Sequence, residues 1–96
     1  MSQPNHSLTR EFTIVNKYGL YVKPAGLFVK LASRFDAEVQ VEKDGYVVPG
    51  NRILGLMVLE ATCGTVLRVT ATGPQAAEVL DALGALVARK FDIPGE

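Results

Sequence analysis

The chain has 96 residues, enough to bury one hydrophobic core but not two. Its 10 lysine and arginine residues balance 10 acidic ones, so no overall field attracts nucleic acid or an anionic membrane, and we expect neither partner. The single cysteine, Cys63, excludes an internal disulfide and a zinc site built on paired thiolates, and we expect no metal and no cofactor.

The first predicted elements are a strand and a helix. Residues 1–7 are polar, lack the cationic and apolar parts of a signal peptide, and are expected to form a flexible tail. From Leu8 to Val15 apolar and polar side chains alternate, which predicts a strand. From Pro24 to Phe35 large apolar residues recur at helical spacing, and Pro24 suits the first turn of a helix. Because no apolar run is long enough to span a membrane, we expect a cytoplasmic protein.

A hairpin and a short helix follow. Residues 38–42 alternate, Asp44-Gly45 is a hairpin turn signal, and residues 46–48 form the return strand. Over residues 52–59, apolar side chains fill too much of the circumference for an ordinary surface helix. This helix is therefore either deeply buried or partly turned toward a partner.

The last predicted elements are a strand over residues 67–72 and a helix that Pro74 opens and Arg89-Lys90 closes. The order βαββαβα predicts a single domain over residues 8–96. Its fold class is α/β (α+β), an open-faced β-sandwich with a four-stranded antiparallel sheet and three helices on one face.

Two segments resemble the histidine-containing phosphocarrier protein (HPr) family. The stretch from Asn16 to Ala25, NKYGLYVKPA, is similar to that family's active-site loop, Gly-Leu-His-x-Arg-Pro-Ala, whose imidazole carries a phosphoryl group between sugar-transport kinases. The stretch from Asn51 to Met57, NRILGLM, is similar to the segment Lys-Ser-Ile-Met-Gly-Val-Met, which opens the family's second helix and in some members carries a regulatory phosphoserine. The resemblance covers residues 8–90 and implies the HPr-like fold.

The same resemblance implies that the family's reactive groups are replaced. Tyr21 stands at the position of the phosphorylated histidine, Lys23 at that of the arginine, and Arg52 at that of the regulatory serine. A phenol, with a pKa of about 10, is a poor nucleophile at neutral pH, whereas an imidazole, with a pKa of about 6.5, suits a relay. Tyr21 could accept phosphate only from a dedicated kinase, and the simpler interpretation is a solvent-facing aromatic residue at a helix entrance. His6, the only histidine, lies in the polar tail, and we do not expect it to substitute.

An anion could still rest at the start of the first helix. Lys23 keeps the charge of the family's arginine without its planar fork. The backbone N–H groups of Val22, Lys23 and Ala25 are expected to point outward, where the helix dipole favours an anion. The alternative is that Lys23 is simply solvated.

The family's docking surface is better preserved than its chemistry. In the family, the start of the first helix and the second helix together bind several enzymes and regulators, and the matching positions here are mostly apolar. The matching protein-binding positions are Leu20, Val22, Lys23, Pro24, Ile53, Leu54 and Met57. Core packing can explain Leu20, Ile53 and Leu56. The candidates for exposure are Val22, Leu54 and Met57.

We therefore expect an HPr-like protein that is not an enzyme, has lost the phosphorylatable histidine and acts as a protein-binding or regulatory module. Its partners are expected to be proteins that dock on the start of the first helix and on the second helix, such as phosphotransferase-system enzymes or a regulator. Two alternatives stay open. One is a phosphocarrier in a phosphoenolpyruvate-dependent phosphorelay, and the other is a small-anion-binding domain.

Overall fold

The computed structural model describes residues 7–96, and the expected tail over residues 1–6, with His6, lies outside the described residues. Ser7, expected in the tail, is instead the first residue of the first strand, where it pairs with Thr72. The elements in chain order are β1 (Ser7–Thr13), α1 (Val22–Ala32), β2 (Glu38–Lys43), β3 (Tyr46–Pro49), α2 (Ile53–Val58), β4 (Val66–Thr72), α3 (Ala76–Ala88) and a 3₁₀ turn, η1 (Lys90–Asp92).

The four antiparallel strands form one sheet in the order β1-β4-β2-β3. β4 pairs with β1 from Ser7↔Thr72 to Thr13↔Val66, and β2 pairs with β4 on one side and with β3 on the other. Between β2 and β3, Asp44 and Gly45 have φ angles of 51° and 85°. Two consecutive left-handed residues are what a type I′ turn requires, so the hairpin predicted at this dipeptide is confirmed.

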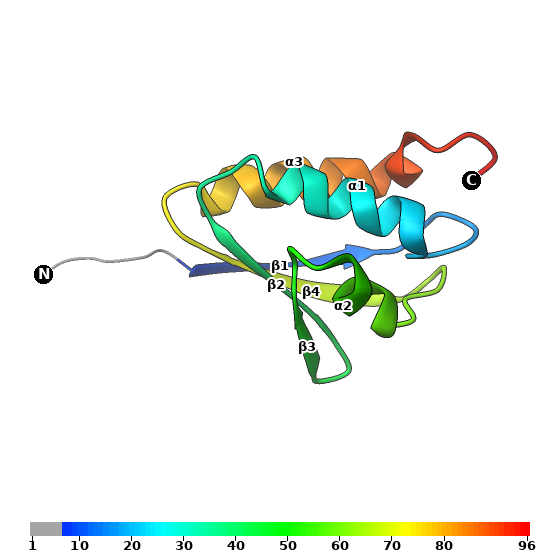
Figure 1. The fold of residues 1–96 in the computed structure, drawn as a ribbon, viewed down its shortest axis with the longest axis horizontal. Coiled ribbons are helices and arrows are strands. Elements are labelled where there is room, and N and C mark those ends of the chain that lie inside the picture. The colour runs from blue at the N-terminus through cyan, green and yellow to red at the C-terminus, as the bar shows by residue number, and fades with distance from the viewer. Residues whose placement is uncertain (1–6) are drawn as a thin grey trace, which may run out of the picture.

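The three helices cover one face of the sheet and leave the other face open (Figure 1). α1 and α3 pack side by side, and α3 also contacts β1 and β4. α2 packs on α1 and β3, and Nζ of Lys43 donates hydrogen bonds to the carbonyls of Leu59 and Glu60 at 2.9 and 3.2 Å. These bonds satisfy carbonyls at the C-terminal end of α2, where the helix dipole also favours a cation. The predicted open-faced α+β sandwich and its element order are confirmed.

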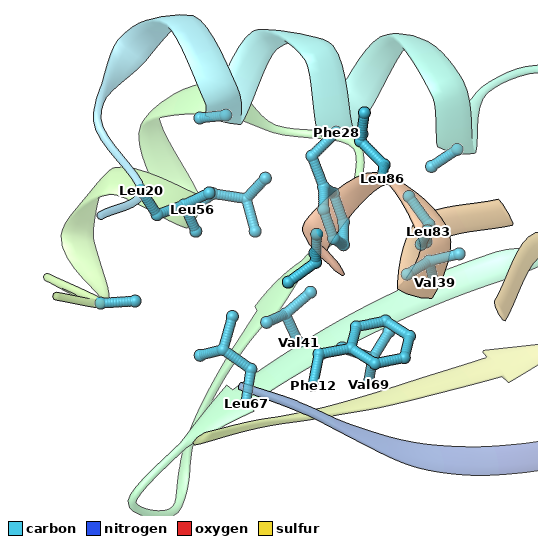
Figure 2. Close-up of a cluster of buried hydrophobic side chains, with 14 of the residues drawn as sticks. Phe12, Leu20, Phe28, Val39, Val41, Leu56, Leu67, Val69, Leu83 and Leu86 are labelled. Carbon is cyan, nitrogen blue, oxygen red and sulfur yellow. The ribbon is translucent and has the colours of Figure 1, made fainter. Parts of the chain in front are cut away.

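Apolar side chains from the sheet and the helices meet in one cluster (Figure 2). Leu67 and Val69 alternate with exposed Arg68 along β4, while Phe28 from α1 and Leu83 from α3 approach from the helical layer. Fully burying an aliphatic or phenylalanine side chain contributes about 1.5–3 kcal/mol, so this cluster holds the helices on the sheet.

The helix ends depart slightly from the sequence prediction. α1 begins at Val22, two residues before Pro24, and α3 begins at Ala76, so Pro74 precedes that helix instead of opening it. After α3, Lys90, Phe91 and Asp92 have φ angles of 57°, 59° and 56° and turn the chain back. Phe91 is buried in the core and therefore anchors the C-terminal segment near the start of α1 (Figure 1).

Candidate functional site

The loop between β1 and α1 is a tight turn fixed against the rest of the fold. Its backbone closes with a 3.3 Å bond from the N–H of Gly19 to the carbonyl of Asn16, and the N–H of Leu20 donates to the carbonyl of Ala61 at 2.9 Å. Gly19 has a φ of 73°, and a Cβ there would lie 2.4 Å from the Ala61 carbonyl oxygen. Only glycine fits this position, because it permits both the left-handed backbone and the close approach.

Tyr21 is the N-cap of α1 and has an extended backbone with no side-chain capping bond. The N–H of Ala25 donates to the carbonyl of Tyr21 at 3.0 Å, which is the first bond of the helix. The expectation that this N–H points outward is therefore wrong, because the helix already uses it. Pro24 has no N–H, so the first turn leaves only the N–H groups of Val22 and Lys23, with no acidic side chain in that turn.

A cluster of polar and aromatic groups surrounds the Tyr21 ring. Tyr18 meets it edge to face with the ring centroids 6.5 Å apart, and Nζ of Lys17 lies 5.2 Å from the centroid of the Tyr18 ring. Burial raises the pKa of the Tyr21 hydroxyl above its ordinary value of 10.0, and the Glu96 carboxylate raises it further by hydrogen bonding and by its charge, with a smaller contribution from Tyr18. The neutral phenol is therefore favoured even more strongly than in water.

Glu96 reaches this cluster from the far end of the chain. Its Oε1 accepts a hydrogen bond of 2.9 Å from the backbone N–H of Tyr18. Burial alone would raise the pKa of Glu96, but hydrogen bonding from the Tyr18 N–H, the Tyr21 hydroxyl, the Asn16 amide and the Lys17 N–H holds it below its ordinary value of 4.5. The contact with defined geometry is the bond from the Tyr18 N–H to Oε1, while Oε2 has no hydrogen-bond partner within residues 7–96. The sequence analysis missed Glu96, for which no sequence signal exists.

The predicted protein-binding positions divide into exposed and buried groups. Val22, with 57% of its surface exposed, and Leu54, with 75%, stand open to solvent as expected, while Met57 is half-buried. Ile53 is 37% exposed, so its expected place in the core is wrong, because α2 presents this residue at its first turn beside α1. We call Val22, Ile53, Leu54, Met57 and the neighbouring exposed Val58, which the sequence analysis missed, the apolar patch.

Leu20 and Pro24 do not belong to that surface. Both are buried: Leu20 belongs to the core cluster that also contains Leu56 (Figure 2), and Pro24 is a buried residue in the first turn of α1. Their inclusion among the protein-binding positions is corrected, and the core positions of Leu20 and Leu56 are confirmed. A buried side chain supports the shape of a docking surface without contacting a partner.

Two cations border the apolar patch. Lys23 and Arg52 are both exposed, and within residues 7–96 neither forms an ion pair. Arg52 is the N-cap of α2, where its positive charge opposes the helix dipole, and its side chain makes no capping bond. Both charges are therefore available to an anionic group from outside the chain.

A protein-family model described as "PTS HPr component phosphorylation site" matches residues 8–89. This chain belongs to the HPr family. The phosphocarrier protein HPr of Cupriavidus necator is 36% identical over 84 residues, which cover 88% of this chain and 94% of the relative. The HPr-like protein Crh of Bacillus subtilis is 44% identical over 71 residues, which cover 74% of this chain and 84% of that protein.

The fold of this HPr-family chain also matches solved structures. The crystal structure of HPr-C-His from Thermoanaerobacter tengcongensis superposes with a TM-score of 0.85 at 37% identity, covering 90% of this chain and 97% of that one. The matched family model is thus named for a phosphorylation site, and the Cupriavidus necator relative is named as a phosphocarrier. No helix in the described part of the chain is both long and apolar enough to cross a bilayer.

Proposed function

We propose that this HPr-family chain has lost histidine phosphotransfer and acts as a protein-binding, regulatory module. Its proposed binding surface is the apolar patch on α1 and α2 with Lys23 and Arg52 at its border. The single observation that carries the proposal is the absence of any histidine from residues 7–96, with Tyr21 at the entrance of α1 where the family's loop carries its imidazole.

The surroundings of Tyr21 support the loss of the relay. A nucleophilic phenol must lose its proton, yet burial and the Glu96 carboxylate both raise the pKa of Tyr21. Glu96 is a poor general base for that proton, because its own pKa is lowered. Tyr21 is therefore a structural group at the helix entrance, and phosphorylation there would need a kinase that supplies its own base.

The patch supports a role in protein binding. Leu54 and Val58 are adjacent on the outer side of α2, and Val22 lies at the start of the helix on which α2 packs. Exposed aliphatic side chains bordered by cations are typical of a docking site, where apolar groups provide binding energy and charges select the partner. A regulatory role also agrees with the relative Crh, one structure of which is described as "Catabolite Repression HPr".

Two alternatives have specific support. The phosphocarrier alternative rests on the matched phosphorylation-site model and on the relatives named as phosphocarriers. The small-anion alternative rests on the N–H groups of Val22 and Lys23, which the first turn of α1 leaves without an acidic partner. The exposed apolar side chains of α2 agree with a protein partner under either the proposed function or the phosphocarrier alternative, whereas the small-anion alternative does not account for them.

Competition with an authentic HPr tests the proposal. We expect this chain to bind the general phosphotransferase kinase and to slow phosphorylation of that HPr, because both proteins use the same docking surface. The Leu54→Glu variant should not slow it. If the folded wild-type chain leaves the rate unchanged, the docking surface has diverged from that of the family.

A further inference from the structure

A cavity of about 410 Å³ opens at the end of α1 that lies away from Tyr21. Its walls come from three segments, which are the C-terminal end of α1 with the turn that follows it, the start of β2, and the connection from β3 to α2. Since α1 has 11 residues and each adds about 1.5 Å, the cavity is roughly 16 Å from the N-cap of that helix. Pockets for small molecules measure about 300–1,000 Å³, so this volume suits a small ligand.

The base of the cavity is apolar and closely packed. Ala32 and Val39 are buried core residues, and Phe35 beside them is half-buried. The backbone of Gly50 lies directly against Val39: its N–H donates to the Val39 carbonyl at 2.7 Å, and a Cβ on Gly50 would lie 2.6 Å from Cγ1 of Val39. An aliphatic group placed on this base would remove apolar surface from water, which favours binding.

Two charged side chains of opposite sign line the same cavity. Glu38 is the first residue of β2 and Arg52 is the N-cap of α2, and both are exposed. In the part of the chain that the structure describes, they form no ion pair with each other or with any other residue. A guanidinium can bind a carboxylate by two hydrogen bonds, and a carboxylate can accept hydrogen bonds from an ammonium group. The cavity therefore offers matching partners to a ligand that carries both charges.

We propose that this cavity binds a free amino acid with an aliphatic side chain. The carboxylate of the ligand pairs with Arg52, its ammonium group pairs with Glu38, and its side chain lies on Val39 and Phe35. A ligand with a single charge would leave one of the two charged residues unmatched. Arg52 also borders the apolar patch, but the other walls of the cavity lie outside that patch. Amino-acid binding is thus separate from the proposed docking function, and its test needs no protein partner.

The test is a titration of the full chain with L-leucine, followed by the amide NMR signals of Val39 and Gly50 at the base of the cavity. We expect both signals to shift saturably. Two analogues separate the charges of leucine: isocaproate lacks the amine, and isopentylamine lacks the carboxylate. Each analogue should bind at least about tenfold more weakly than leucine, because it loses hydrogen bonds between charged groups.

Variants of the two charged residues identify the site. Arg52→Gln and Glu38→Gln should each weaken leucine binding about fivefold or more, since each removes one charged partner of the ligand. Both residues are exposed, so the fold should tolerate the change, and an otherwise unchanged spectrum verifies this. Arg34→Gln is the matched control. It removes an exposed arginine near the end of α1 that does not line the cavity, and it should bind leucine as the wild type does.

Each outcome decides the proposal. It is overturned if L-leucine causes no saturable shift, if either analogue binds as tightly as leucine, or if Arg52→Gln and Glu38→Gln bind leucine as the wild type does. A loss of affinity in Arg34→Gln as large as that in Arg52→Gln would also overturn it, because the effect would then come from net charge and not from the cavity.

Discussion

The backbone N–H of Tyr18 donates a 2.9 Å hydrogen bond to Oε1 of Glu96, which lies 78 residues further along the chain. This bond closes the C-terminal segment over the loop that carries Tyr21. Glu96 gains a proton in acid and Tyr21 loses one in alkali. The contact of the C-terminal segment with the loop is therefore expected only between these two titrations.

The closure should open in acid. The pKa of Glu96 is lowered in the fold, so its contribution to stability is complete above the ordinary value of 4.5 and is lost as the pH falls from 4.5 through the lower folded value. The Tyr18 amide signal should follow this titration in NMR spectra, and Glu96→Gln should abolish the response. If the Tyr18 amide signal of the wild type does not change with pH in this range, the contact between Glu96 and the Tyr18 N–H is contradicted.

In alkali, ionisation of Tyr21 should also weaken the contact between the loop and Glu96. Its pKa is raised, so its contribution is complete below 10.0 and is lost as the pH rises from 10.0 through the higher folded value, where a phenolate would face the Glu96 carboxylate. Ultraviolet titration can follow this ionisation. Glu96→Gln should lower the apparent pKa of Tyr21, since it removes the neighbouring charge.

Gly19→Ala should destabilise the protein strongly. The φ of 73° costs an alanine about 1–2 kcal/mol, and the new Cβ would also collide with the Ala61 carbonyl, adding about 1–3 kcal/mol of overpacking. Gly45→Ala is the control, because its φ of 85° carries the same backbone strain while no atom lies within 4 Å of the new Cβ. Urea unfolding measures the difference, and equal losses in the two variants would refute the close packing at Gly19.

Leu54→Glu should abolish competition for the general kinase with little change in the melting temperature. Leu54 is 75% exposed, so the fold does not need it, whereas loss of a central anchor costs binding about 2 kcal/mol or more. Val66→Glu, on the open face of the sheet, is the matched control and should compete normally. Leu56→Ala should instead lose about 2–5 kcal/mol of stability, because that side chain is fully buried. A marked fall in the melting temperature of Leu54→Glu would place Leu54 in the core.

The sequence predicts the fold well because strand alternation, helical periodicity and the Asp44-Gly45 turn all act locally. It predicts the surface less well. α2 has only six residues, too few for periodicity to separate exposed Ile53 from buried Leu56. The contact of Glu96 could not be predicted, because it depends on three consecutive left-handed residues, Lys90 to Asp92, none of which is glycine.

Restoring the family's side chains should restore part of its chemistry. The double variant Tyr21→His with Lys23→Arg would place an imidazole at the N-cap of α1. Its guanidinium could form bidentate hydrogen bonds to a phosphate. We expect partial, acid-labile phosphorylation by phosphoenolpyruvate and the general kinase. The single variant Lys23→Arg, which lacks the imidazole, is the control and should accept none. A folded double variant that accepts no phosphate would mean that the docking surface no longer fits the kinase.

The most direct test incubates the wild-type chain with phosphoenolpyruvate and the general kinase, beside an authentic HPr, and measures intact masses. The account predicts that the authentic HPr gains a phosphoryl group while this chain gains none, because no imidazole is present in residues 7–96 and the pKa of Tyr21 is raised. The same measurement on His6→Ala removes the one histidine outside that range. Phosphate that appears on the wild type and persists in His6→Ala would contradict the account.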